Sequence, residues 1–185
     1  RLGAADWEWG LGVNTQSAGQ FATANLDWVN ERVYGWTLSY SGTGSATIEV
    51  RDGGALLFTR TWASGMDAGN ALKLYVKSTT GIAAGNLVTA TSATLNGQPA
   101  AGSIQTAGTG EFSEASLFWF YPAMSQGFTA TGTVKLTFTG SYPPTGSRLN
   151  FIVTAGTLPC APLSSTDTTC DDIATNRTRC QALAS

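Results

Sequence analysis

Hydrophobic and polar residues alternate along much of the chain, and the clearest example is residues 127–140, GFTATGTVKLTFTG. Apolar residues occupy one parity of this stretch, whereas threonines and one lysine occupy the other. Successive side chains of a strand point to opposite faces, so the pattern predicts a strand with one buried and one solvated face. The branched Cβ of threonine favours the same extended backbone.

The same alternation recurs between turn signals along the chain. The strongest hairpin joins residues 32–41 to 46–50 through the glycine-containing turn at 42–44, and a second turn at 52–54 leads into the next strand. Strands are also expected over residues 6–14, 20–28, 56–62, 72–77, 87–95, 116–121 and 149–158. Residues 98–110, rich in Ala, Gly, Ser and Thr, are expected to form a long mobile loop. About ten strands without a clear helix before residue 160 predict an all-β fold, an antiparallel β-sandwich or jelly roll.

We expect residues 1–158 to form this sandwich as one domain, followed by a short Cys-containing C-terminal tail over residues 159–185. Aspartates early and arginines late in the tail favour a short helix over residues 170–180. Such a helix excludes a Cys170–Cys180 bridge. Ten helical residues rise about 15 Å, whereas bridged Cα atoms lie less than ~7 Å apart.

Three cysteines, Cys160, Cys170 and Cys180, lie in this tail. Their odd number leaves one thiol free or bonded to another chain, so we expect one intrachain disulfide, with an interchain bridge as the alternative. No metal site and no cofactor are expected, because histidine is absent and the cysteine spacings are long. Asn176 begins an N-x-T sequon and is a candidate glycosylation site.

Charged residues make up only 12% of the chain, against roughly 25% in average domains. Weak charge repulsion lowers the barrier to self-association. No cluster of basic residues indicates a nucleic-acid partner, and no apolar run is long enough for a membrane span. Six Trp, 22 Gly and a first residue that is Arg rather than Met favour a secreted protein with a processed N-terminus, at the cell surface.

No catalytic residue is predicted, and we expect a non-enzymatic protein. Without histidine, a Ser-His-Asp triad is impossible. Glu111 and Glu114 flank an apolar strand, but residues three apart on a strand point to opposite faces and do not form a glycosidase pair. Asp6, Asp52 and Asp67 are loop carboxylates that suit calcium, yet no EF-hand spacing is present.

Two stretches are candidates for contact between copies of the chain. The strand over residues 6–14 is either the first strand of the sandwich or a strand that completes a neighbouring copy by strand addition. Residues 116–121 are apolar on both faces, as in a central strand covered on both sides or a strand beneath a neighbouring subunit. The candidate interface residues are Trp7, Trp9, Leu11, Val13, Phe118 and Phe120.

The expected partner is therefore a second copy, in a filament or surface layer. The alternative is a carbohydrate-binding module in which exposed Trp rings stack on cell-surface polysaccharide. The threonine row at residues 129–139 is similar to rows on ice-binding surfaces. One strand is not an array, however, so an ordinary solvated face is expected.

Three segments carry a resemblance to a known family: GFTATGTVKLTFTGSYPPTGSRLNFIVTAG, VYGWTLSYSGTGSATIEV and LVTATSATLNGQ. Together they resemble the choice-of-anchor W type of domain over most of residues 28–156. The resemblance implies a bacterial secreted or surface β-domain and assigns no functional residue. The chain departs from that pattern after residue 158, where a Cys-containing tail stands in place of a sorting helix with a basic stop.

Overall fold

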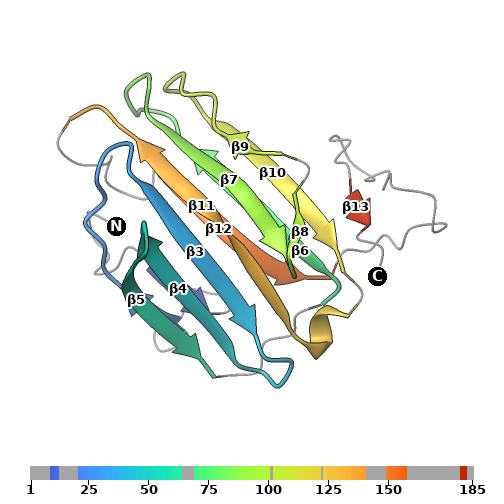
Figure 1. Ribbon diagram of the computed structural model, residues 1–185. Helices are drawn as coiled ribbons and strands as arrows, with labels where there is room; N and C mark the ends of the chain where they lie inside the picture. The colour runs from blue at the N-terminus through green and yellow to red at the C-terminus, as the bar shows by residue number, and fades with distance from the viewer. Residues whose placement is uncertain are drawn as a thin grey trace.

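The computed structural model describes residues 9–12, 21–63, 69–100, 102–121, 123–140, 149–157 and 180–182. These residues form two main sheets, one larger than the other, packed face to face as a β-sandwich, which confirms the expected fold class (Figure 1). Among them, the only helical turn is the 3-10 helix η1, Met124–Gln126. No described helix has the length and apolar character needed to cross a membrane.

The large sheet has the strand order β5-β4-β3-β11-β7-β8, with β9 also paired to β7. Its strands are β3 (Val33–Tyr40), β4 (Ala46–Asp52), β5 (Ala55–Trp62), β7 (Leu87–Leu95), β8 (Gln98–Pro99), β9 (Ile104–Gln105) and β11 (Phe128–Thr137). The small sheet has the order β12-β6-β10-β13. Its strands are β6 (Ala71–Ser78), β10 (Ser113–Phe120), β12 (Leu149–Gly156) and β13 (Cys180–Ala182). A separate hairpin consists of β1 (Trp9–Gly12) and β2 (Phe21–Ala24).

Strand β11 lies in the middle of the large sheet, between β3 and β7. Its apolar parity is buried, and its threonine parity faces solvent, as the alternation predicts. Gly132 interrupts the buried row because the Trp36 ring occupies the space beside it. A Cβ atom at this position would lie 2.7 Å from Cζ2 of Trp36. A residue without a side chain therefore lets the large indole pack flat against the centre of the sheet.

The predicted hairpins are confirmed. Strands β3 and β4 pair in register across the turn at residues 42–44, and β4 pairs with β5 across residues 53–54. Asn96 and Gly97 both adopt positive φ, 49° and 79°, and join β7 to β8. An Asn-Gly pair suits such a turn because both residues tolerate the left-handed conformation.

The expectation of a mobile loop over residues 98–110 is wrong in part. This segment contributes β8 and β9, and Ile104 and Thr106 are buried. Thr106 exchanges two hydrogen bonds with Val88. Its backbone N–H donates to the Val88 carbonyl over 3.1 Å, and its hydroxyl accepts from the Val88 N–H over 3.1 Å. Small residues give no periodic signal, yet their backbone can pair with the edge of β7.

The predicted tail helix over residues 170–180 lies outside the described residues except for its last position. Cys180 begins strand β13, which pairs in parallel with the end of β10. The chain is therefore extended at residue 180. The predicted domain boundary between residues 158 and 159 also lies outside the described residues.

Candidate functional site

The β1–β2 hairpin differs from the rest of the fold in how it is held. Its two strands pair with each other, with Trp9 opposite Ala24 and Leu11 opposite Ala22. Within the described residues, neither strand forms a backbone ladder with the two larger sheets. Two strands of four residues are marginally stable alone, so side-chain packing must hold this hairpin in place.

Trp9 supplies that packing. Its side chain is 8% exposed, and its ring centroid lies 5.7 Å from that of Trp28, 5.8 Å from Phe58 and 6.3 Å from Phe151. These three rings come from the β2–β3 connection, from the large sheet and from the small sheet. Leu11 is half-buried against the same core. Trp9 therefore joins the hairpin to both layers of the sandwich, behind β4 and β5 (Figure 1).

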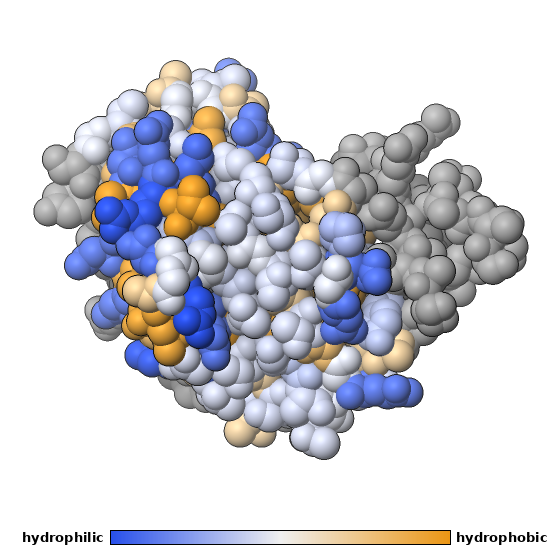
Figure 2. Space-filling view, in the orientation of Figure 1, coloured by the Kyte–Doolittle hydropathy of each residue, from blue (hydrophilic) through white to orange (hydrophobic). Residues whose placement is uncertain are grey.

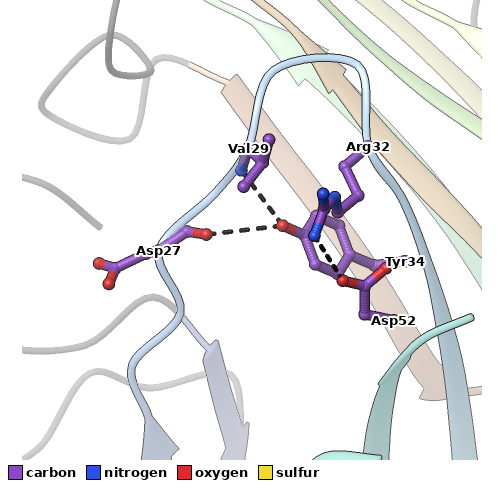
Figure 3. Close-up of polar contacts among 5 residues, drawn as sticks. All are labelled: Asp27, Val29, Arg32, Tyr34 and Asp52. Carbon is purple, nitrogen blue, oxygen red and sulfur yellow. Dashed lines mark hydrogen bonds and ion pairs between the residues drawn. The ribbon is translucent and has the colours of Figure 1, made fainter. Parts of the chain in front are cut away.

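The β2–β3 connection is anchored more firmly, through Tyr34 (Figure 3). The Tyr34 hydroxyl accepts a hydrogen bond from the Val29 N–H over 3.1 Å and donates to the Asp27 carbonyl over 3.5 Å. Arg32 forms an ion pair with Asp52 at 2.7 Å. These bonds fasten the β2–β3 connection to the large sheet. Strand β2 itself is joined to β5 by the Arg60 side chain, whose Nε–H donates to the Thr23 carbonyl. In the described part of the chain, β1 is held by its ladder with β2 and by its own side chains.

The predicted interface residues divide between two places. Trp9 and Leu11 lie inside the sandwich, whereas Phe118 lies on the outer face of the small sheet, half-buried. Trp7, Val13 and the side chain of Phe120 lie outside the described residues. Strand β10 pairs with β6 on one side and with β13 at its end, so it is an interior strand of the small sheet there.

Alternation over residues 72–77 places Lys73, Tyr75 and Lys77 on the outer face of the small sheet. The Lys73 Nζ atom lies 4.6 Å from the ring centroid of Tyr75 and 5.4 Å from that of Phe118. The Lys77 Nζ atom lies 5.3 Å from the centroid of Phe112. Each ammonium is thus attracted to aromatic rings. The sequence analysis missed this cluster, although the parity of 73, 75 and 77 predicts its β6 half.

Tyr75 is also joined to Glu114, which extends from the neighbouring strand. Its hydroxyl donates a 2.6 Å hydrogen bond to Oε2 of Glu114. Burial of the phenol, that hydrogen bond and the negative charge of Glu114 together raise the pKa of Tyr75 from 10.0 to about 12. The phenol therefore stays protonated and keeps donating over the whole physiological range.

Two of the carboxylates considered in the sequence, Glu114 and Asp52, already have partners. The Glu114 carboxylate accepts a hydrogen bond from the Tyr75 hydroxyl, and Asp52 forms an ion pair with Arg32. The described residues contain no cluster of three or more side chains able to hold a metal ion. Asp6 and Asp67, together with Cys160, Cys170 and Asn176, lie outside the described residues. For Cys180, the structure places the backbone opposite Phe118 in the β10–β13 register.

Among the described residues, no tryptophan is in the exposed class. Trp9, Trp36 and Trp119 are buried, and Trp28 and Trp62 are half-buried. Trp7 lies outside the described residues. The predicted carbohydrate surface needs exposed indole rings, so the five described tryptophans do not favour it.

No family model matches the chain, and no curated protein matches its sequence. The resemblance to the choice-of-anchor W type of domain therefore stays a prediction from the quoted segments. The geometry of the described residues has to carry the functional argument.

Proposed function

We propose that this chain is a non-enzymatic structural subunit, secreted to the cell surface, that self-associates by exchanging its N-terminal strand between copies. One observation carries the proposal. Strand β1 forms a backbone ladder with β2 alone among the described residues, yet its Trp9 is buried between the two sheets. A strand that is held to the two sheets by side chains and not by a backbone ladder can be supplied equally well by a neighbouring copy.

Trp9 fills a space among three aromatic rings, and its departure would leave an apolar cavity there. If β1 moves away, the rings of Trp28, Phe58 and Phe151 lose their central neighbour and become accessible to water. An apolar cavity of this kind is costly, and the same Trp from a second copy fills it with identical contacts. Exchange therefore conserves the contacts within each sandwich while linking two chains.

Two sequence features support the same proposal. The low content of charged residues leaves little repulsion between copies. The odd cysteine in the tail also provides a thiol for an interchain bridge, which stays a prediction. Neither feature identifies the strand that is exchanged, and that assignment rests on Trp9.

A disulfide placed across the hairpin distinguishes exchange from closure within one chain. Leu11→Cys and Ala22→Cys face each other in the β1–β2 register, where paired Cα atoms lie within bridging distance. The variant also carries Ser at the three natural cysteines, and electron microscopy first establishes that this background still assembles. After oxidation, exchange predicts covalent dimers and higher species on a non-reducing gel.

The matched control places a second pair within the large sheet. Ser39→Cys and Thr47→Cys face each other between β3 and β4, which belong to one hairpin of one chain. This pair should close within single chains and run as a monomer. If the hairpin pair also runs only as a monomer in samples that contain assemblies, the exchange mechanism is excluded.

A further inference from the structure

Charged and exposed apolar residues are confined to two surfaces of the described chain. One group of charges lies on the β2–β3 connection and on strands β3 to β5. Lys135 of β11 belongs to the same group, because it is opposite Val33 in the strand register. The other lies on β6 and from residue 111 to 114. The six exposed large hydrophobic residues are found in the same two places. Elsewhere the described surface is mostly Thr, Ser, Gly, Asn and Gln.

The first of these, the corner surface, consists of residues 27–33 and the start of β5. Val29, Val33, Leu56 and Leu57 are between 41% and 50% exposed. Figure 2 shows apolar residues among strongly hydrophilic ones on this side of the molecule, over the starts of β3 and β5. Two exposed carboxylates, those of Asp27 and Glu31, form no ion pair with any described residue.

The second, the ring surface, is the outer face of the small sheet around Lys73, Tyr75 and Lys77. Phe112 is 53% exposed and Ile152 is 44% exposed beside them, and Ile152 is opposite Tyr75 in the register. Both lysines are half-buried against rings. Like the two carboxylates, they form no ion pair with any described residue.

We propose that the ring surface of one copy binds the corner surface of the next. Lys73 and Lys77 then face Asp27 and Glu31, and Phe112 and Ile152 pack against the exposed aliphatic side chains. Among the described residues, the two lysines of the ring surface and the two carboxylates of the corner surface form no ion pair, and both surfaces expose apolar groups. Glu114 also lies on the ring surface, where Tyr75 holds it, and Lys135 lies beside Val33 of the corner surface. Charge complementarity of this kind selects the register of a contact.

The geometry determines the type of assembly. The ring surface is the outer face of the small sheet, whereas Val33 and Leu56 of the corner surface are at outward-facing positions of the large sheet. A contact between two different surfaces of the same molecule is heterologous and leaves one of each free at the ends. It therefore repeats from copy to copy, and it gives a ring where the rotation closes and an open filament or layer where it does not. This inference rests on the proposed self-association and explains how exchanged pairs would extend into a filament or layer.

Charge reversal with rescue tests the contact. The double variant Lys73→Glu, Lys77→Glu in the full chain should raise the concentration needed for extended assemblies at least tenfold. Adding Asp27→Lys and Glu31→Lys to the same chain restores opposite charges and should restore assembly. Circular dichroism and thermal melting check the fold, which these exposed or half-exposed positions should leave unchanged.

Two controls separate this contact from other effects. Thr129→Glu with Thr61→Glu adds acidic charge to the outer face of the large sheet, at the end of the sheet away from the corner surface, and should leave assembly unchanged. The Leu11–Ala22 cysteine pair should still give covalent dimers in the Lys73→Glu, Lys77→Glu variant, because strand exchange does not use the ring surface.

Each contrary result has a defined meaning. Assembly that persists after charge reversal, or that the fourfold variant does not restore, overturns the proposed contact while leaving strand exchange in place. A wild-type chain that neither assembles nor forms hairpin cross-links overturns both. A monomeric wild-type chain that binds polygalacturonate, with binding lost in Lys73→Glu, Lys77→Glu, assigns the ring surface to an acidic polysaccharide instead.

Discussion

The outer faces of the two sheets follow the same alternation of buried and solvated positions but differ in their chemistry. On the large sheet, the solvated positions are mainly threonine and serine, and Figure 2 shows a pale central surface over β3, β11 and β7. On the small sheet, the corresponding positions hold lysine, tyrosine, phenylalanine and isoleucine beside Glu114, Ser116, Asn150 and Thr154. The backbone pattern alone therefore does not decide what a sheet face can bind.

The threonine face satisfies its own hydrogen bonds. Thr131 and Thr94 hydroxyls lie 2.8 Å apart, and those of Thr133 and Thr91 lie 2.6 Å apart. The hydroxyl rows extend over β3, β4, β5, β7 and β11, so the premise that a single strand carries them was wrong. Their cross-strand bonding still fits an ordinary solvated face, which stays a prediction.

The ring surface, by contrast, keeps cations beside aromatic rings. Lys73 and Lys77 lie over rings and form no ion pair with a described residue, although Glu114 is opposite Lys77 in the strand register. Tyr75 holds Glu114. Apolar rings remain partly exposed here, whereas the threonine face exposes none among the described residues. The threonine face is therefore suited to solvent, whereas the ring surface, like the corner surface at the starts of β3 and β5, exposes apolar side chains for a dry contact.

The largest expected effect comes from removing the residue that both sheets share. Trp9→Ala should lower the free energy of unfolding by about 3–5 kcal/mol, because it empties the space between Phe58 and Phe151. It should also abolish assembly. Trp9→Phe retains a ring and should lose less than half as much stability in urea denaturation. Equal losses in the two variants would contradict the packing role.

A smaller effect tests the interior of the large sheet. Gly132→Ala should cost about 1–3 kcal/mol, because its Cβ would collide with the Trp36 ring. Gly35→Ala is the matched control on the neighbouring strand, where Cβ of Arg51 lies 4.0 Å from the added Cβ. The control should be neutral or slightly stabilising. Similar urea midpoints for both variants would rule out the clash.

The next prediction concerns the ring surface. Tyr75→Phe should cost about 1 kcal/mol at neutral pH, the scale of one hydrogen bond. Because the folded pKa is raised, the stabilisation is fully present below pH 10 and is lost as the pH rises towards about 12. Ultraviolet titration of wild type minus Tyr75→Phe should show one phenol ionising near pH 12. A midpoint near 10 would contradict the bond to Glu114.

The smallest effect is expected on the threonine face. Thr131→Val removes one hydroxyl of a cross-strand pair and should cost about 0.2–1 kcal/mol. The variant should fold normally and assemble at the wild-type concentration, as judged by urea denaturation and light scattering. Loss of assembly in this variant would place the contact on the threonine face instead of the corner surface and reverse the comparison.

Sequence reasoning predicted the local structure well and the arrangement of strands less well. Alternation identified the buried parity of β11 and the β3–β4 hairpin, because both depend on neighbouring residues alone. It missed β8 and β9, whose small residues carry no periodic signal. It also did not predict the contact between Lys77 and Phe112, because that contact depends on how β6 lies beside β10. The register between two strands is a property of tertiary packing.

The most direct test of the account is negative-stain electron microscopy of the purified wild-type chain over a range of concentrations, with and without reductant. The account predicts filaments or a lattice. Their loss on adding reductant would assign the odd cysteine to an interchain bond, and their persistence would place the linkage in strand exchange and the ring–corner contact. Uniform monomers at every concentration, in both conditions, would contradict the central claim that this sandwich is a self-associating subunit.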